Sequence, residues 1–117
     1  MPHPPAFIDL CNTAKEQIKE ITWTATQQAL QTHHGLLIDV REDHEWAQGH
    51  INGAIYRGRG IIERDIHTLA LDTHTPIYLY CGGGYRSALA AYNLQQMGYT
   101  HVHSIIGGYR AWTEQKK

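Results

Sequence analysis

The chain has 117 residues, of which 42% are hydrophobic and 18% charged, and its formal net charge is −1. This length and composition predict one globular domain with its own core and exclude a disordered chain. The near-neutral charge gives no reason to expect nucleic acid or an anionic membrane as partner, and no apolar run is long enough to cross a bilayer.

The first third of the chain predicts two helices. Apolar residues recur at three- and four-residue steps from Phe7 to Ile21, which indicates an amphipathic helix with Cys11 on its apolar face. Thr24 is the candidate cap of a second helix that ends near residues 34–35. We assign residues 1–19 to an N-terminal amphipathic helical extension and residues 20–117 to the main domain. The extension is expected to pack on this domain, with docking of a partner as the alternative.

Three short apolar runs bounded by turn-forming residues predict strands buried on both faces. They cover residues 36–40, 77–80 and 102–106. Helical patterns cover residues 43–48, 61–71, 87–97 and 108–115. The alternation of short strands with helices predicts an α/β domain with a mainly parallel sheet.

The most informative stretch is YLYCGGGYRSAL, residues 78–89, in which a cysteine ends a buried strand and three glycines precede a helix. In open parallel sheets, ligands bind at the carboxyl ends of the strands. Consecutive glycines can adopt positive φ and turn several amides inward, forming an anion site that the helix N-terminus reinforces. Cys81 would lie at the floor of this bowl and Arg86 at its rim. Such a bowl favours a thiolate and the negative outer sulfur of a persulfide.

The same loop lacks the features of a nucleotide site. Neither a Gly-x-Gly-x-x-Gly pattern nor a Gly-Lys-Ser/Thr ending is present. The two cysteines and nine histidines show no metal-ligand spacing, so we expect no metal and no other cofactor. Cys11 and Cys81 are expected to be free thiols, and the absence of a secretory pattern at the N-terminus predicts a cytoplasmic protein.

Four separated motifs, in order, resemble those of the rhodanese-like sulfurtransferases. They are LIDVR (37–41), EW (45–46) followed by GHINGAI (49–55), the loop from Tyr80-Cys81 to Arg86-Ser87, and GGYRAW (107–112). The resemblance covers about residues 21–112. It implies a rhodanese-like fold, in which a mainly parallel central sheet of about five short strands is flanked by helices on both faces.

The resemblance also implies a double displacement at Cys81. The thiolate takes the outer sulfur of a small anionic donor such as thiosulfate, and the resulting persulfide passes it to cyanide or to a thiol, which can belong to a protein. Motif matching assigns Cys81 as the catalytic residue. It assigns the substrate-binding residues as Gly82, Gly83, Gly84, Tyr85, Arg86 and Ser87.

Individual residues in and around these motifs keep two interpretations. The amides of residues 82–86 would hold the persulfide, and Arg86 would place an anionic donor. Ser87 could donate its hydroxyl to the sulfur or cap the helix, and Tyr85 could wall the pocket or cover the loop.

Charged residues outside the loop are expected to support the structure. We favour a buried structural pair for Asp39 and Arg41 over a contribution to the pocket, and a hydrogen-bonded turn residue for His50. Arg57 and Arg59 lie where loops of this family border the pocket mouth. They could attract the donor or an acidic partner, but solvated surface charge is the favoured interpretation.

Two other classes of function remain as alternatives. A non-enzymatic persulfide carrier or sulfide-binding module that serves a protein partner would use the same Cys81. A cysteine phosphatase or arsenate reductase would need five residues between cysteine and arginine. Here four residues separate Cys81 from Arg86, and this shorter loop suits a sulfur atom better than a tetrahedral oxyanion.

Overall fold

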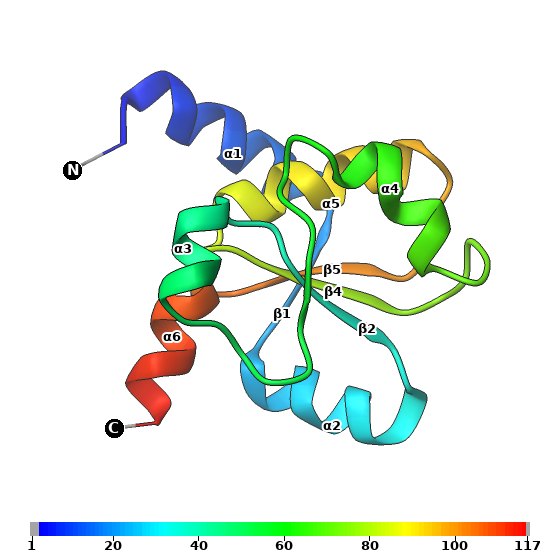
Figure 1. Cartoon of the computed structure of the whole chain (residues 1–117). Coiled ribbons are helices and arrows are strands. Elements are labelled where there is room, and N and C mark those ends of the chain that lie inside the picture. Colours follow the sequence, from blue (N-terminus) through cyan, green and yellow to red (C-terminus); the bar gives the residue numbers. More distant parts are fainter. Residues whose placement is uncertain (1–2, 117) are drawn as a thin grey trace.

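A computed structural model describes residues 3–116 of the chain (Figure 1). The described residues form a five-stranded sheet in the order β1-β5-β4-β2-β3, and every neighbouring pair is parallel. The strands are β1 (Lys19–Ile21), β2 (Leu36–Asp39), β3 (Ile55–Tyr56), β4 (Ile77–Tyr80) and β5 (Val102–Ile105). The helices are α1 (Pro5–Gln17), α2 (Trp23–His33), α3 (Asp43–Gln48), α4 (Ile62–Leu69), α5 (Arg86–Gln96) and α6 (Gly108–Gln115). The predicted α/β fold is therefore confirmed.

Helices cover both faces of the sheet, with α1, α4 and α5 on one side and α2 and α6 on the other (Figure 1). Because side chains alternate along a strand, the central strands contribute to two separate cores. Ile38 and Leu79 belong to the core under α4 and α5. Leu37 and Tyr80 belong to the opposite core, together with Trp23 of α2. Strands buried on both faces explain the nearly continuous apolar runs of the sequence.

The N-terminal helix is shorter than predicted. Helix α1 ends at Gln17, and residues 19–21, expected to continue it, form the edge strand β1 instead. Lys19 and Ile21 pair with His103 and Ile105 of β5, and this pairing supplies backbone hydrogen bonds that the helical pattern could not reveal. Helix α1 then packs along α5, which agrees with the expectation that the extension packs on the domain.

The cap of the second helix is also displaced from its predicted position. The Oγ1 of Thr22 accepts a hydrogen bond of 3.2 Å from the amide of Ala25, so Thr22 is the N-cap and Thr24 lies inside α2. Starting the helix at Trp23 directs the indole into the core, where its Nε1 donates to the carbonyl oxygen of Gly108 at 2.8 Å. This bond ties α2 to the start of α6.

Candidate active site

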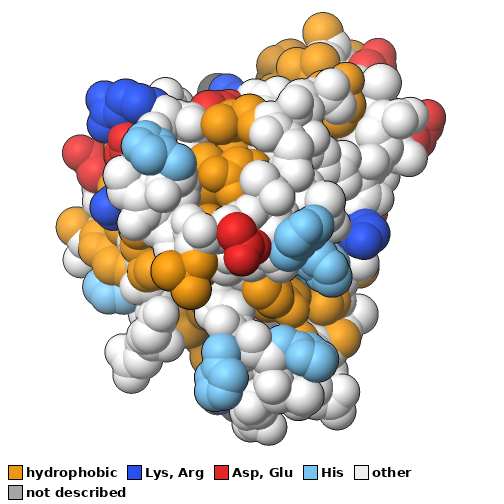
Figure 2. Space-filling model, turned by 90° about the vertical axis from the view of Figure 1, so that its right-hand side faces the viewer, with side chains coloured by type: hydrophobic (Ala, Val, Ile, Leu, Met, Phe, Trp, Pro, Cys, Tyr) orange, Lys and Arg blue, Asp and Glu red, His pale blue; other side chains and the backbone are white. Residues whose placement is uncertain are grey.

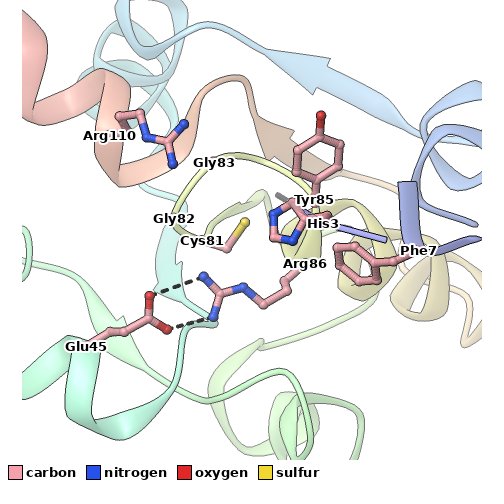
Figure 3. Close-up of a pocket in the computed structure, with 9 residues that line it drawn as sticks. All are labelled: His3, Phe7, Glu45, Cys81, Gly82, Gly83, Tyr85, Arg86 and Arg110. Atoms are coloured by element: carbon pink, nitrogen blue, oxygen red, sulfur yellow. Dashed lines mark hydrogen bonds and ion pairs between the residues drawn. The ribbon is translucent and has the colours of Figure 1, made fainter. Parts of the chain in front are cut away.

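A pocket of about 330 Å³ opens at the carboxyl end of β4, directly before α5 (Figure 3). It is lined by His3, Phe7, Glu45, Cys81, Gly82, Gly83, Tyr85, Arg86 and Arg110. These residues come from α1 and the short segment before it, α3, the loop after β4, α5 and α6. The carboxyl edge of a parallel sheet is where such convergence is expected.

The Cys81 side chain lies at the floor of this pocket and is almost completely buried. The amide of Gly84 donates a 3.1 Å hydrogen bond to its Sγ, and Sγ lies 3.4 Å from the Oγ of Ser87. Ser87 in turn shares a 2.8 Å hydrogen bond with the Oγ of Ser104 on β5. The sulfur therefore lies among hydrogen-bonding groups that can stabilise negative charge on it.

The loop reaches this geometry with less glycine freedom than the sequence suggested. Of the three consecutive glycines, only Gly84 adopts a left-handed φ, of 100°. A Cβ there would lie 3.4 Å from the backbone nitrogen of Gly107, a close but tolerable contact, so the reason for glycine at this position is its φ angle. The Gly84 amide is also the one that contacts Sγ. The contribution of the other loop amides to an outer sulfur stays a prediction.

Ser87 is not the helix cap that one interpretation proposed. Helix α5 begins at Arg86 without a side-chain capping bond, and the Ser87 hydroxyl points instead to Cys81 and Ser104. Ser104 was missed by sequence reasoning because a serine in a buried strand carries no motif. Its place opposite Ser87 becomes visible only when β5 is paired with β4.

Arg86 lies at the rim as expected, but its guanidinium group forms an ion pair with Glu45. Its NH1 and NH2 donate to the two carboxylate oxygens of Glu45 at 2.6 and 3.2 Å (Figure 3). The hydrogen bond from Arg86 lowers the pKa of Glu45 to about 2, so this carboxylate is ionised throughout the physiological range. The sequence alone assigns Glu45 no role of its own. Its membership of a family motif was the one sign that it belongs to the site.

The Glu45–Arg86 pair leads to a pH-dependent prediction for stability. Because the pKa of Glu45 is lower in the folded state than its ordinary value of 4.5, the pair stabilises the fold above about pH 4.5 and loses this effect as the pH falls toward 2. We expect Glu45→Gln, which keeps an oxygen for the amide of Glu42, to cost about 1–2 kcal/mol at pH 7 after allowance for solvent screening. Chemical denaturation of both proteins at pH 7 and pH 3 measures this difference. The prediction is wrong if the difference in unfolding free energy between the two proteins is no smaller at pH 3 than at pH 7.

Arg110 is a second arginine at the pocket, and sequence reasoning did not single it out. It lies in the first turn of α6, and its amide donates to the carbonyl oxygen of Gly82 at 3.0 Å. Its side chain is exposed and makes no ion pair with any of residues 3–116. In Figure 3 it lies across the sulfur from the ring of Phe7. Within the described part of the chain, Arg110 therefore offers the pocket of Cys81 a positive charge that no ion pair neutralises.

The supporting residues lie outside the pocket lining. Arg41 donates to both carboxylate oxygens of buried Asp39 at 2.8–3.1 Å and to the carbonyl oxygen of Gly49 at 2.7 Å. This geometry matches the structural pair favoured from the sequence. His50 is exposed, its Nδ1 lies 3.0 Å from the carbonyl oxygen of Trp46, and its ring stacks on that indole.

The remaining candidates are also separate from the sulfur. Arg57 pairs with Asp65 at 3.4 Å, and Arg59 borders a different cavity between α1 and α5. Cys11 is fully buried in α1, and burial raises the pKa of its thiol, which keeps it protonated. These placements leave Cys81 as the cysteine with access to the pocket.

Histidines lie at several separate places on one face of the molecule (Figure 2). Among residues 3–116, no three His, Cys, Asp or Glu side chains are grouped so that they could hold a metal ion. No helix within the same range has the length and apolar character needed to cross a membrane.

A family model for the rhodanese-like domain matches residues 22–115. The chain is similar to two proteins of Bacillus subtilis: "Uncharacterized protein YqhL", 38% identical over 65% of this chain, and "Putative sulfur carrier protein YrkF", 32% identical over 82%. It spans 59% and 51% of their respective lengths. A solved structure from Rhodopseudomonas palustris, titled as a protein of unknown function and possible tyrosine phosphatase, is 29% identical with a TM-score of 0.78, over 99% of this chain and 96% of that one.

Proposed function

The chain belongs to the rhodanese-like domain family, and we propose that it is a sulfurtransferase that carries sulfane sulfur as a persulfide on Cys81. The observation that carries this proposal is the position of Sγ, at the floor of an open pocket and within hydrogen-bond distance of the Gly84 amide and the Ser87 hydroxyl. The similarity to a protein named as a sulfur carrier supports the same chemistry.

The reaction proceeds in two displacements. The Cys81 thiolate attacks the outer sulfur of thiosulfate or a similar donor, the donor S–S bond breaks, and sulfite leaves with the bonding electron pair. Cyanide or a thiolate then attacks the outer sulfur of the Cys81 persulfide and regenerates the thiolate. The Gly84 amide stabilises negative charge on Sγ in the free thiolate, which attacks in the first step and leaves in the second. The two steps need no cofactor, because both are nucleophilic substitutions at sulfur.

Mass spectrometry of the protein and of its peptides tests the intermediate directly. The protein is mixed with thiosulfate, freed of excess donor, and digested without reductant. We expect a gain of one sulfur atom on the peptide that contains Cys81 and none on the peptide that contains Cys11, whose thiol is buried. Subsequent cyanide should remove the added sulfur. Absence of the added sulfur under conditions in which thiosulfate is consumed contradicts the persulfide mechanism.

The carrier alternative shares the intermediate and differs in turnover. A carrier loads Cys81 once and releases sulfur only to its own protein partner, whereas a sulfurtransferase cycles with small acceptors. Steady-state thiocyanate formation over many equivalents distinguishes the two. We propose a cytoplasmic location for either role, because a reducing compartment keeps Cys81 and Cys11 as thiols.

A phosphatase role is less well supported by this site. Four residues separate Cys81 from Arg86, and Glu45 occupies the guanidinium group that a phosphate would require. The phosphatase description belongs to the similar protein from Rhodopseudomonas palustris. Hydrolysis of an aryl phosphate that is lost in Cys81→Ser would overturn our preference.

Arg110 is our candidate for attracting the anionic donor. The placement of the donor by Arg86 stays a prediction, but Glu45 balances that charge, so we expect Arg110 to carry the larger part. Arg110→Gln should lower kcat/KM for thiosulfate about tenfold at low ionic strength, and the loss should shrink as salt screens the charge. The matched control is Arg64→Gln, which removes an equal charge from an exposed position on α4. Equal effects of the two substitutions would remove the proposed role.

A further inference from the structure

A second cavity, of about 420 Å³, lies between α1 and α5, two helices that pack along each other (Figure 1). We call it the α1–α5 groove, and it is bounded by Phe7, Leu10 and Ala14 of α1, Leu89 and Tyr92 of α5, and Arg59 of the loop after β3. Its volume falls within the range of sites for small organic molecules. Cys81 does not line it, so the proposed sulfur transfer gives the groove no role.

The walls of the α1–α5 groove are mostly apolar, and they are not fully buried. The lining residues of α1 and of α5 follow three- and four-residue steps, so each helix presents one stripe of side chains to the groove. Leu10 is 58% exposed, and Phe7, Leu89 and Tyr92 are half-buried. An apolar group that filled the groove would remove this surface from water, which is favourable.

Arg59 supplies the charge at the groove. Its side chain is exposed and forms no ion pair with any other residue that the structure describes. Two other polar side chains border the groove, but each already has a partner. Thr13 donates to the carbonyl oxygen of Asp9 at 2.9 Å, and Asn93 donates to the carboxylate of Glu63 at 2.6 Å. None of the described residues that line the groove is acidic, so the groove favours a ligand with a negative group.

We propose that the α1–α5 groove binds a small amphipathic monocarboxylate, whose apolar tail lies between α1 and α5 and whose carboxylate pairs with Arg59. A guanidinium group presents two parallel N–H donors that match a carboxylate, and it keeps its charge throughout the physiological pH range. One guanidinium group balances a single negative charge. A dianion such as phosphate would retain an uncompensated charge beside apolar walls, which is unfavourable. This site is independent of the proposed sulfur transfer, because neither Cys81 nor Arg110 lines the groove.

Isothermal titration calorimetry of the full chain tests the class of ligand with three probes. Octanoate should bind as one equivalent with a Kd of about 1 mM or lower. Butanoate lacks four methylene groups, each of which adds about fourfold in affinity when fully buried. Because the walls of the groove are partly exposed, we expect butanoate to bind at least about tenfold more weakly. Octylammonium has the same tail and the opposite charge, so it should bind at least about fivefold more weakly than octanoate.

Substitutions of arginine test the position of the carboxylate. Arg59→Gln should lower the octanoate affinity about threefold to fivefold at low ionic strength, and this loss should shrink as salt screens the charge. Arg64→Gln is the matched control, because Arg64 is an exposed arginine of α4 that does not line the groove. Arg110→Gln removes the charge at the other pocket. Both should leave the octanoate affinity unchanged.

Substitutions of leucine test the position of the apolar tail. Leu10→Ser should lower the octanoate affinity about threefold, because a polar side chain replaces part of the apolar wall. Leu10 is largely exposed without ligand, so its replacement should leave the fold intact. Leu71→Ser is the matched control, because Leu71 follows α4, is 97% exposed and does not line the groove. It should leave the octanoate affinity unchanged.

Three results would overturn the carboxylate site. The first is the absence of saturable octanoate binding below about 5 mM. The second is wild-type affinity in Arg59→Gln together with weaker binding in Arg110→Gln, which would place the carboxylate in the pocket of Cys81. The third is a dimer, seen by sedimentation velocity without ligand, that octanoate dissociates, since the groove would then be an interface between two chains. Cys81→Ser should bind octanoate with unchanged affinity, so failure of this site and failure of the proposed sulfur transfer are distinguishable.

Discussion

Replacing Cys81 by serine should abolish sulfur transfer while leaving the fold intact. A serine hydroxyl can neither become the nucleophile at neutral pH nor form a persulfide, so the rate of thiocyanate formation from thiosulfate should fall below about a thousandth of the wild-type rate. The serine oxygen can still accept a hydrogen bond from the Gly84 amide and form one with the Ser87 hydroxyl. The substitution should therefore lower the free energy of unfolding by only about 1 kcal/mol. Steady-state cyanolysis and thermal melting by circular dichroism measure both quantities.

Cys11→Ala provides the control for this experiment. Cys11 is fully buried against the domain, where it acts as a small apolar side chain, and its raised pKa disfavours the reactive thiolate. We expect a loss of about 1 kcal/mol or less in stability and unchanged transfer. Full activity in Cys81→Ser, or loss of transfer in a folded Cys11→Ala protein, would show that the wrong cysteine has been assigned.

The central strands and the loop from Cys81 to Arg86, which we call the catalytic loop for its proposed role, were predictable because their signals are local. Residues 36–39 and 77–80 are short apolar runs. A strand with apolar side chains on both faces is buried on both sides, which places it in the centre of the sheet. The edge strand β1 had no such signal. Residues 19–21 continue a helical pattern, and only pairing with β5 makes them a strand. A three-residue strand is decided by tertiary contact rather than by its own sequence.

The pocket residues also divide into those with a local sequence signal and those placed by tertiary contacts. Cys81 and its loop are contiguous, so one motif predicted them together. Arg110 and Phe7 lie far from that loop in sequence and reach the pocket through the docking of α6 and α1. Arg110 belongs to the GGYRAW motif and Phe7 to the amphipathic helical pattern, but neither pattern indicates a place at the pocket. Their contribution could not be predicted without knowing how those two helices pack.

The docking of α6 on the catalytic loop leads to the second large prediction, for Gly108→Ala. Gly108 has φ 53°, and a Cβ there would overlap the carbonyl oxygen of Cys81 and lie 3.0 Å from the carbonyl carbon of Gly82. The adjoining amides of Tyr109 and Arg110 donate to the carbonyl oxygens of Cys81 and Gly82 at 2.7 and 3.0 Å. A methyl group must separate α6 from the loop, so both bonds weaken. We expect a loss of about 2–4 kcal/mol from overpacking and weakened hydrogen bonds.

Catalysis should suffer as well as stability, because the displaced carbonyl belongs to Cys81 itself. A shift of the loop by about 1 Å can cost about a hundredfold in kcat/KM, measured well below the melting temperature of the variant. Gly98→Ala separates this effect from backbone strain. Gly98 has φ 102°, a harder conformation for alanine, but a Cβ there meets nothing within 4 Å. The control should lose only about 1 kcal/mol and keep full transfer. If Gly108→Ala behaves like Gly98→Ala, contact between α6 and the loop does not position Cys81.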